Sequence, residues 1–247
     1  MNRKTFKLGI SIVLVVLLVG VGLFTLWAQN PYSASEIALQ ALESDDLVLV
    51  NEESGLITFE PVNAQSDIGF IFYPGGRVDY RAYAPVLHKI AAHGYFVALV
   101  SVPLNMAIFN TNAADSVMEL FPNIQQWVVG GHSLGGVTAS SYASENLVQI
   151  DGLVFWASYP ADDSLKDTNI KALTIYGTND MEGDKQINIS KSRLPDSALF
   201  ITIDGGNHAQ FGSYGPQPGD RPATITDEEQ WAQAAELTVQ FLESLNE

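Results

Sequence analysis

The chain has 247 residues, of which 47% are hydrophobic and 16% are charged, and it contains no cysteine. This length suits one globular domain with a short appendage. The net charge of −16 argues against nucleic acid as a partner, because phosphates require a basic surface, and against electrostatic attachment to anionic lipid. Without cysteine, disulfides, thiolate nucleophiles and cysteine-ligated metal sites are excluded.

A long apolar segment lies near the N-terminus. Residues Leu8 to Trp27 carry no charge, and at 1.5 Å per residue they reach about 30 Å, enough to cross a bilayer core. Three basic residues precede them: Arg3, Lys4 and Lys7. Because Trp27 is large where a signal-peptide cleavage site requires a small residue, we expect residues 1–28 to form an uncleaved anchor with its basic end in the cytoplasm. Cleavage near residues 33–35, which would give a secreted protein, and burial as a core helix are the alternatives.

Short apolar runs alternate with helical stretches along the rest of the chain. We expect residues 29–44 to form a polar connector and residues 45–247 to form one domain. The predicted strands are 46–51 and 55–61, paired as a hairpin, followed by 68–73, 95–100, 127–130, 152–156, 172–176 and 198–203. The predicted helices are 80–93, 113–120, 134–144, 184–190 and 227–245, the last opening with a capping box from Thr226 to Glu229. Strands that alternate with helices indicate an α/β fold with a mainly parallel central sheet.

The segment Gly131-His132-Ser133-Leu134-Gly135 follows a predicted strand and precedes a helix rich in small residues. Gly-x-Ser-x-Gly occurs by chance in many chains, but a sharp strand-to-helix turn requires small residues on both sides of the serine. Such a turn exposes the Ser133 hydroxyl and places the Leu134 N–H at a helix N-terminus, where a negative oxygen is stabilised. The pattern predicts a nucleophilic serine. A phosphate-binding loop is disfavoured, because no Lys-Ser/Thr pair and no Gly-x-Gly-x-x-Gly is present.

With this motif the sequence resembles the α/β-hydrolase superfamily, and within it the small, lidless, dienelactone-hydrolase-like or "fold-5" branch. The resemblance covers roughly residues 45 to 245. It implies an α/β-hydrolase fold and a catalytic triad in the chain order serine, acid, histidine.

Four histidines are available as the base for Ser133. His88 and His93 lie five residues apart on one predicted helix, which suits neither a shared site nor a metal pair. His132 directly precedes the nucleophile, so its side chain should diverge from that of Ser133. His208 remains, and it lies in a glycine-containing loop after the last predicted sheet strand, where the superfamily has its catalytic histidine.

The resemblance also indicates the acid and the second oxyanion donor. Asp180 follows a predicted strand as the family's acid does, and its competitors are Asp162, Asp163, Asp184 and Asp204. The second donor should lie in Pro74-Gly75-Gly76, where many relatives have His-Gly at the first two positions. The backbone N–H of Gly76 is the inferred donor, with Arg77 next in line. Residues 211–220 are expected to shape the pocket, unless they are a plain connector.

These residues predict a serine hydrolase that acts on a small ester-like substrate through an acyl-enzyme and needs no metal or organic cofactor. An acyltransferase or amidase with the same triad and a catalytically silent surface-binding domain are the alternatives. The membrane is expected as a partner through the N-terminal helix. Neither acyl size nor oligomeric state can be read from the sequence.

Overall fold

A computed structural model describes residues 3–63 and 66–246. Eight strands form one sheet in the order β1-β2-β4-β3-β5-β6-β7-β8. The first two are β1 (Val48–Glu53) and β2 (Leu56–Pro61), which pair with each other antiparallel. The other six run parallel: β3 (Ile68–Tyr73), β4 (Phe96–Val100), β5 (Gln126–His132), β6 (Gly152–Trp156), β7 (Lys171–Gly177) and β8 (Leu199–Ile203). The expected α/β-hydrolase fold with a mainly parallel sheet is confirmed.

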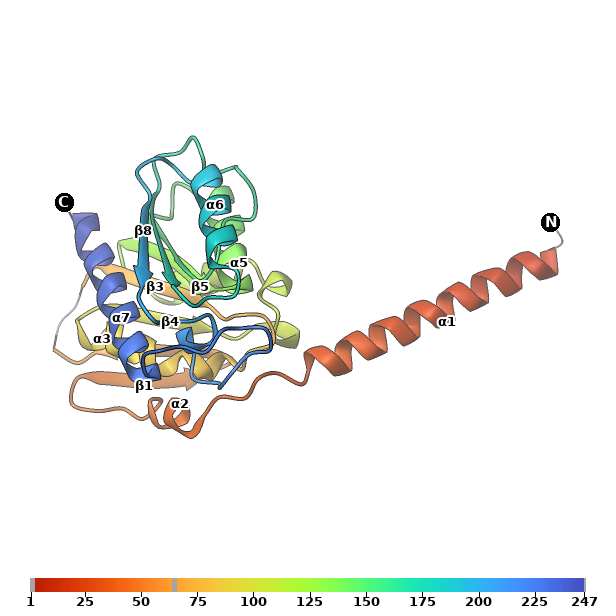
Figure 1. The fold of residues 1–247 in the computed structure, drawn as a ribbon, viewed down its shortest axis with the longest axis horizontal. Helices are drawn as coiled ribbons and strands as arrows, with labels where there is room; N and C mark the ends of the chain where they lie inside the picture. The colour runs from red at the N-terminus through yellow and green to blue at the C-terminus, as the bar shows by residue number, and fades with distance from the viewer. Residues whose placement is uncertain (1–2, 64–65, 247) are drawn as a thin grey trace.

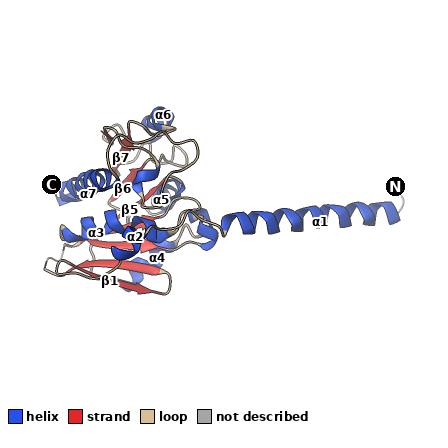
Figure 2. Ribbon diagram, turned by 60° about the horizontal axis from the view of Figure 1, so that its bottom comes forward, coloured by secondary structure: helices blue, strands red, loops and turns tan. Residues whose placement is uncertain are grey.

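Helices cover both faces of this sheet (Figures 1 and 2). The helices α3 (Ala84–Ala92) and α7 (Asp227–Glu243) pack on one face, where one hydrophobic core forms. A second core lies beneath α4 (Ala113–Leu120) and α5 (Leu134–Glu145) on the other face; α6 (Gly183–Arg193) follows β7 along the chain. Because both faces are covered, β3, β4 and β6 are buried along their whole length, which explains their unbroken apolar sequences.

The predicted elements are present with small shifts at their ends. The hairpin turn lies at Ser54 and Gly55, one to two residues later than expected, because β1 extends to Glu53. The predicted helix 80–93 begins with a 3-10 turn at Tyr80–Tyr83 and becomes α-helical at α3, which has a proline in its first turn. The capping box of α7 forms as predicted between Thr226 and Glu229.

Residues 29–44 pack against the domain. A short helix that was not predicted, α2 (Glu36–Gln40), is capped by Ser35. The backbone N–H of Ser35 donates to the Ser213 carbonyl at 2.8 Å. Tyr32 forms an isolated parallel bridge with Val78. The segment therefore contacts first the loop after β3, at Val78, and then the loop after β8, at Ser213.

The first helix, α1 (Arg3–Ala28), projects from the body as a long isolated rod (Figure 1). Its stretch Ile10–Ala28 has a mean hydropathy of 2.7 and is long and apolar enough to cross a membrane. The side chains from Ile10 to Phe24 are exposed. The alternative of a buried core helix is thereby contradicted, since such a helix would have to pack inside the domain.

Candidate active site

Ser133 occupies a sharp turn between β5 and α5. Its backbone has φ +51° and ψ −121°, a region that residues with a side chain rarely adopt. Three donors fix its carbonyl oxygen: the N–H groups of Gly136 at 3.1 Å and Val137 at 3.3 Å, and the hydroxyl of Ser158 at 2.6 Å. The turn is thus held in a strained conformation by specific hydrogen bonds. Ser158 was not found from the sequence, because no motif marks it.

The two glycines that flank Ser133 are required by close backbone approaches. A Cβ on Gly131 would lie 2.5 Å from the carbonyl carbon of Gly135, and a Cβ on Gly135 would lie 2.1 Å from the carbonyl oxygen of Tyr73. Both contacts are with backbone atoms, so a side chain at either position would force the start of α5 away from the sheet. The small residues predicted from the motif therefore have a direct steric cause.

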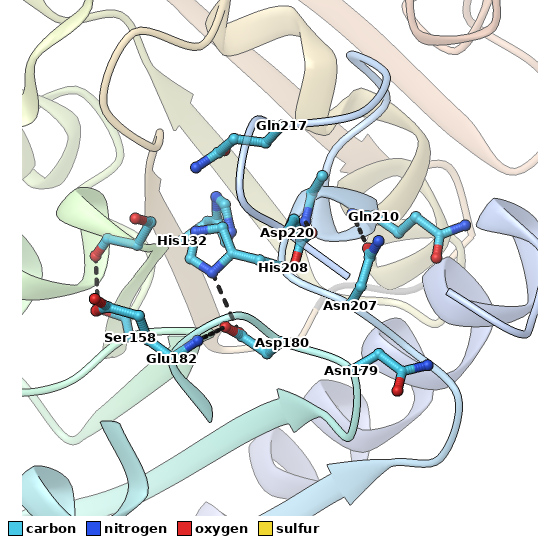
Figure 3. A network of polar contacts seen from close by, with 12 residues as sticks. His132, Ser158, Asn179, Asp180, Glu182, Asn207, His208, Gln210, Gln217 and Asp220 are labelled. Carbon is cyan, nitrogen blue, oxygen red and sulfur yellow. Dashed lines mark hydrogen bonds and ion pairs between the residues drawn. The ribbon is translucent and has the colours of Figure 1, made fainter. Parts of the chain in front are cut away.

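His208 and Asp180 lie against each other after β8 and β7. The Nδ1 of His208 is 3.2 Å from Oδ2 of Asp180, and both side chains are almost completely buried. The other carboxylate oxygen, Oδ1, accepts the backbone N–H of Glu182 at 3.0 Å. Asp180 can therefore orient the imidazole and fix the proton on Nδ1, which leaves Nε2 as an acceptor. Figure 3 shows this pair, with the ring of His132 close by.

The loop that carries His208 is held from both sides. Gln230 on α7 is fully buried, and its amide exchanges two hydrogen bonds with the backbone of Asn207, at 2.9 Å and 2.8 Å. Asp220 accepts the N–H of Ala209 at 2.8 Å. Sequence reasoning missed Gln230 and Asp220, since both act through contacts distant in the chain and neither belongs to a recognisable motif.

Two backbone amides near Ser133 are the predicted oxyanion donors, those of Leu134 and Gly76. Leu134 is the first residue of α5, so its N–H has no partner within the helix. In the loop after β3, the N–H of Gly75 donates to Tyr83 Oη at 3.0 Å and that of Arg77 donates to the Asn105 carbonyl at 2.7 Å. Among the described backbone hydrogen bonds none uses the N–H of Gly76, which leaves Gly76 rather than Arg77 as the available donor.

Ser133 and His208 line one cavity of about 240 Å³. In the described part of the chain, neither the Ser133 hydroxyl nor His208 Nε2 has a hydrogen-bond partner. The other lining residues are Leu134, Val137, Ala157, Tyr159, Met181, Glu182, Gln186 and Gln217. Gln217 belongs to the segment 211–220 that was expected to shape the pocket.

His132 is fully enclosed behind His208. Its ring centroid lies 4.6 Å from that of His208, and Tyr83 Oη lies 2.8 Å from its Nδ1. Tyr83 Oη also accepts the N–H of Gly75 at 3.0 Å, so the same phenol contacts His132 and the loop after β3, whereas Nε2 of His132 has no hydrogen-bond partner among the described residues. Burial, aided by the proximity of His208, lowers the pKa of His132 well below 6.5. A neutral His132 avoids repelling the positive charge that His208 would carry as a base.

The competing residues lie elsewhere. Asp162 is exposed and bonds to the Ser164 N–H, Asp163 is exposed, and Asp204 bonds to Thr178. The side chain of Asp184 lies outside the described residues. His88 packs against Phe59 and faces Asp45, and His93 ends α3. The described residues contain no cluster of histidines and carboxylates that could hold a metal ion.

The fold and the site together define the α/β-hydrolase class. The defining features are a mainly parallel sheet in this strand order, a strained serine at a strand-to-helix turn, and a buried His–Asp pair at the same edge. A family model described as "Alpha/beta hydrolase family" matches residues 69–232. The chain belongs to this family of enzymes, as the resemblance predicted. A search of curated protein sequences found no match.

Solved structures share the fold at low sequence identity. A dienelactone hydrolase from Anabaena variabilis superposes with a TM-score of 0.59 at 16% identity, covering 80% of this chain and 98% of that one. The esterase domain of a Rhodothermus marinus protein gives 0.61 at 11% identity, covering 80% and 97%. A predicted CIB-like hydrolase from Thermoplasma acidophilum gives 0.57 at 14% identity, covering 80% and 99%. At these identities the likeness concerns the fold.

Proposed function

We propose that the protein is a serine esterase that hydrolyses carboxylic esters through an acyl-enzyme. Ser133 attacks the ester carbonyl, His208 takes its proton through Nε2, and Asp180 stabilises the imidazolium. The N–H groups of Leu134 and Gly76 bind the oxyanion. His208 then protonates the leaving alcohol and activates a water molecule that frees the acid. The observation that carries the proposal is the strained Ser133, which shares a cavity with a histidine whose Nδ1 faces a buried carboxylate.

Residues 45–247 form the catalytic domain in this proposal, and residues 1–28 anchor it in a membrane. The junction supports an uncleaved anchor. Ala28 is fully buried against the domain, and its carbonyl accepts a hydrogen bond from the Asn105 side chain at 3.0 Å. Arg77 donates to the carbonyls of Trp27 at 3.1 Å and Asn30 at 2.7 Å. Cleavage near residues 33–35 would remove all of these contacts, and from the positive N-terminal segment we expect the domain on the outer side.

A fluorophosphonate probe tests the proposal, because it labels only an activated serine. The full-length protein in detergent should be labelled, whereas S133A and H208A should not. The variant S141A is the matched control, since Ser141 lies on α5 and bonds only to the Val137 carbonyl. Labelling that persists in S133A would reject Ser133 as the nucleophile. A series of p-nitrophenyl esters of rising chain length then defines acyl preference.

A further inference from the structure

The C-terminal end of α1 rests on the loop that follows β4. This loop, residues 103–109, consists of two short 3-10 turns and is called the 103–109 loop below. The ring of Phe109 meets that of Phe24 edge to face, with centroids 6.2 Å apart. Even so, Ile108 and Phe109 keep 50% and 48% of their surfaces exposed. The exposed apolar surface of α1 therefore continues onto the domain.

The same loop reaches the oxyanion amides. A Cβ on Gly76 would lie 3.1 Å from the Leu134 side chain and 3.6 Å from Sδ of Met106. Asn105 accepts the N–H of Arg77, as described above, and its φ of +53° is rare for a residue with a side chain. The loop is thus held in one specific conformation. It connects the apolar helix to the wall of the active site within a few residues.

The junction carries side chains of the kinds that gather at a bilayer surface. The guanidinium of Arg77 lies 4.3 Å above the ring of Trp27 and 5.6 Å from that of Tyr32, and aromatic and basic side chains of this kind gather at the membrane–water interface. Phe24 lies one helical turn before Ala28, about 6 Å further along the axis. With α1 across a bilayer, its partner Phe109 lies on the hydrocarbon side of this interface, and the body of the domain lies at the C-terminal end of α1 (Figure 1).

The volume of the cavity and the net charge of the protein limit the class of substrate. About 240 Å³ beside Ser133 is less than the 300–1,000 Å³ of typical ligand pockets, so the rest of a long ester must extend out of the cavity. The net charge of −16 offers no attraction to anionic headgroups. Contact between the domain and the lipid must therefore come from apolar side chains.

On the basis of the proposed esterase function, we infer that the substrate is an uncharged or zwitterionic long-chain ester held in the membrane that α1 spans. The ester reaches Ser133 along the 103–109 loop. Ile108 and Phe109 insert into the outer leaflet and lead the chain past Met106 to the oxyanion amides.

Paired rates on two substrates test this inference. The full-length protein in phosphatidylcholine nanodiscs is given water-soluble p-nitrophenyl acetate and, separately, 4-methylumbelliferyl oleate dissolved in the bilayer. The ratio of the oleate rate to the acetate rate should fall at least tenfold in I108S and F109S. It should stay within twofold of wild type in V148S, because Val148 is fully exposed and lies before β6, at the sheet edge away from Ser133.

Insertion can be measured independently of activity, because the chain has no cysteine. The variants I108C and V148C each receive an NBD fluorophore. A quencher attached to lipid chains should reduce NBD emission at position 108 and leave it unchanged at position 148. Quenching at neither position would overturn insertion of the loop, whatever the rates.

The outcomes separate this inference from the function on which it rests. Loss of acetate hydrolysis in S133A together with an unchanged rate ratio in I108S and F109S would overturn the inference and leave the esterase standing. Hydrolysis of acetate that persists in S133A would instead reject the esterase, and the inference with it. Wild-type hydrolysis of acetate with no oleate cleavage above the S133A background would also overturn the inference.

Discussion

The hydroxyl of Tyr83 joins His132 to the loop after β3: it lies 2.8 Å from His132 Nδ1 and accepts the N–H of Gly75 at 3.0 Å. Tyr83 and His132 are both buried, and the ring of His132 lies 4.6 Å from that of His208 at a tilt of 54°. One phenol therefore connects the loop of Gly76 with the support of the proposed base. Neither Tyr83 nor His132 contacts the cavity beside Ser133, so both are positioning residues.

Replacing Tyr83 with phenylalanine should weaken both folding and turnover. Y83F leaves the Gly75 N–H and His132 Nδ1 unpaired in a buried site, at a cost of about 1–3 kcal/mol for each group. We expect the free energy of unfolding to fall by about 2–4 kcal/mol, and kcat on a soluble ester to fall about tenfold with little change in KM. Y80F is the control, because Tyr80 bonds to Glu52 at an exposed position. Equal behaviour of the two variants would contradict a role for the Tyr83 hydroxyl.

Burial of neutral His132 should make folding sensitive to acid. The pKa of His132 is about 6.5 in the unfolded chain and well below that in the folded protein. At a pH between these two pKa values, the unfolded chain binds a proton at His132 that the folded chain does not. The free energy of unfolding is then unaffected above about pH 7 and falls below pH 6.5, by up to about 1.4 kcal/mol per pH unit.

Burial also lowers the pKa of His88, so His88 would add its own pH dependence. The measurement therefore removes His88 from both proteins and compares H88Q with H88Q/H132N. Asparagine keeps an oxygen that can accept from Tyr83. Urea unfolding followed by tryptophan fluorescence at pH 5 to 8 should show a shallower decline in the double variant. Parallel curves would mean that His132 does not titrate on unfolding.

Changing Asp180 to asparagine should remove most of the activity while keeping the fold. The amide of D180N can donate to His208 Nδ1 and so favour the tautomer that has its proton on Nε2, the nitrogen that must accept from Ser133. We expect kcat to fall by about 10³- to 10⁴-fold. D162N changes an exposed carboxylate of the same kind and should retain the wild-type rate. If D162N lost activity instead, the acid would have to be sought after β6.

The sequence predicted the sheet because long apolar runs mark strands covered on both faces, as in β3 and β6. It also located three side chains that the structure brings to one edge. Ser133 carries a local motif, and His208 remained after three other histidines were set aside. Asp180 could be chosen only with the help of the family resemblance, since it was one of five candidate aspartates.

The supports of the site could not be predicted in this way. Gln230 and Asn207 are 23 residues apart and Tyr83 and His132 are 49 apart, and neither pair leaves a periodic or compositional trace. The 103–109 loop lacked a pattern as well, because its two 3-10 turns are too short to show a period. Such contacts depend on how the whole sheet brings distant loops together.

The glycine at position 135 should tolerate no side chain. In G135A the Cβ would lie 2.1 Å from the Tyr73 carbonyl oxygen and 2.6 Å from that of Pro74, and neither backbone atom can move without shifting the end of β3. We expect a loss of about 2–3 kcal/mol, or roughly 5–10 °C in the midpoint of thermal unfolding. G183A is the control, because its Cβ would meet Asp180 Cβ at an ordinary 3.5 Å in a helical position that favours alanine. A midpoint for G135A equal to that of G183A would show that the turn can relax.

Gln230 should control the position of His208 from α7. Q230L keeps the side-chain volume but leaves the N–H and the carbonyl of Asn207 without partners in a buried site, which costs about 1–3 kcal/mol for each group. The loop should then hold His208 less firmly against Asp180, so kcat should fall about tenfold while KM changes less than twofold. Q233L is the matched control, since Gln233 is exposed on the same helix. A rise in KM at constant kcat would instead assign Gln230 to substrate binding, whereas loss of stability without loss of kcat would limit it to folding.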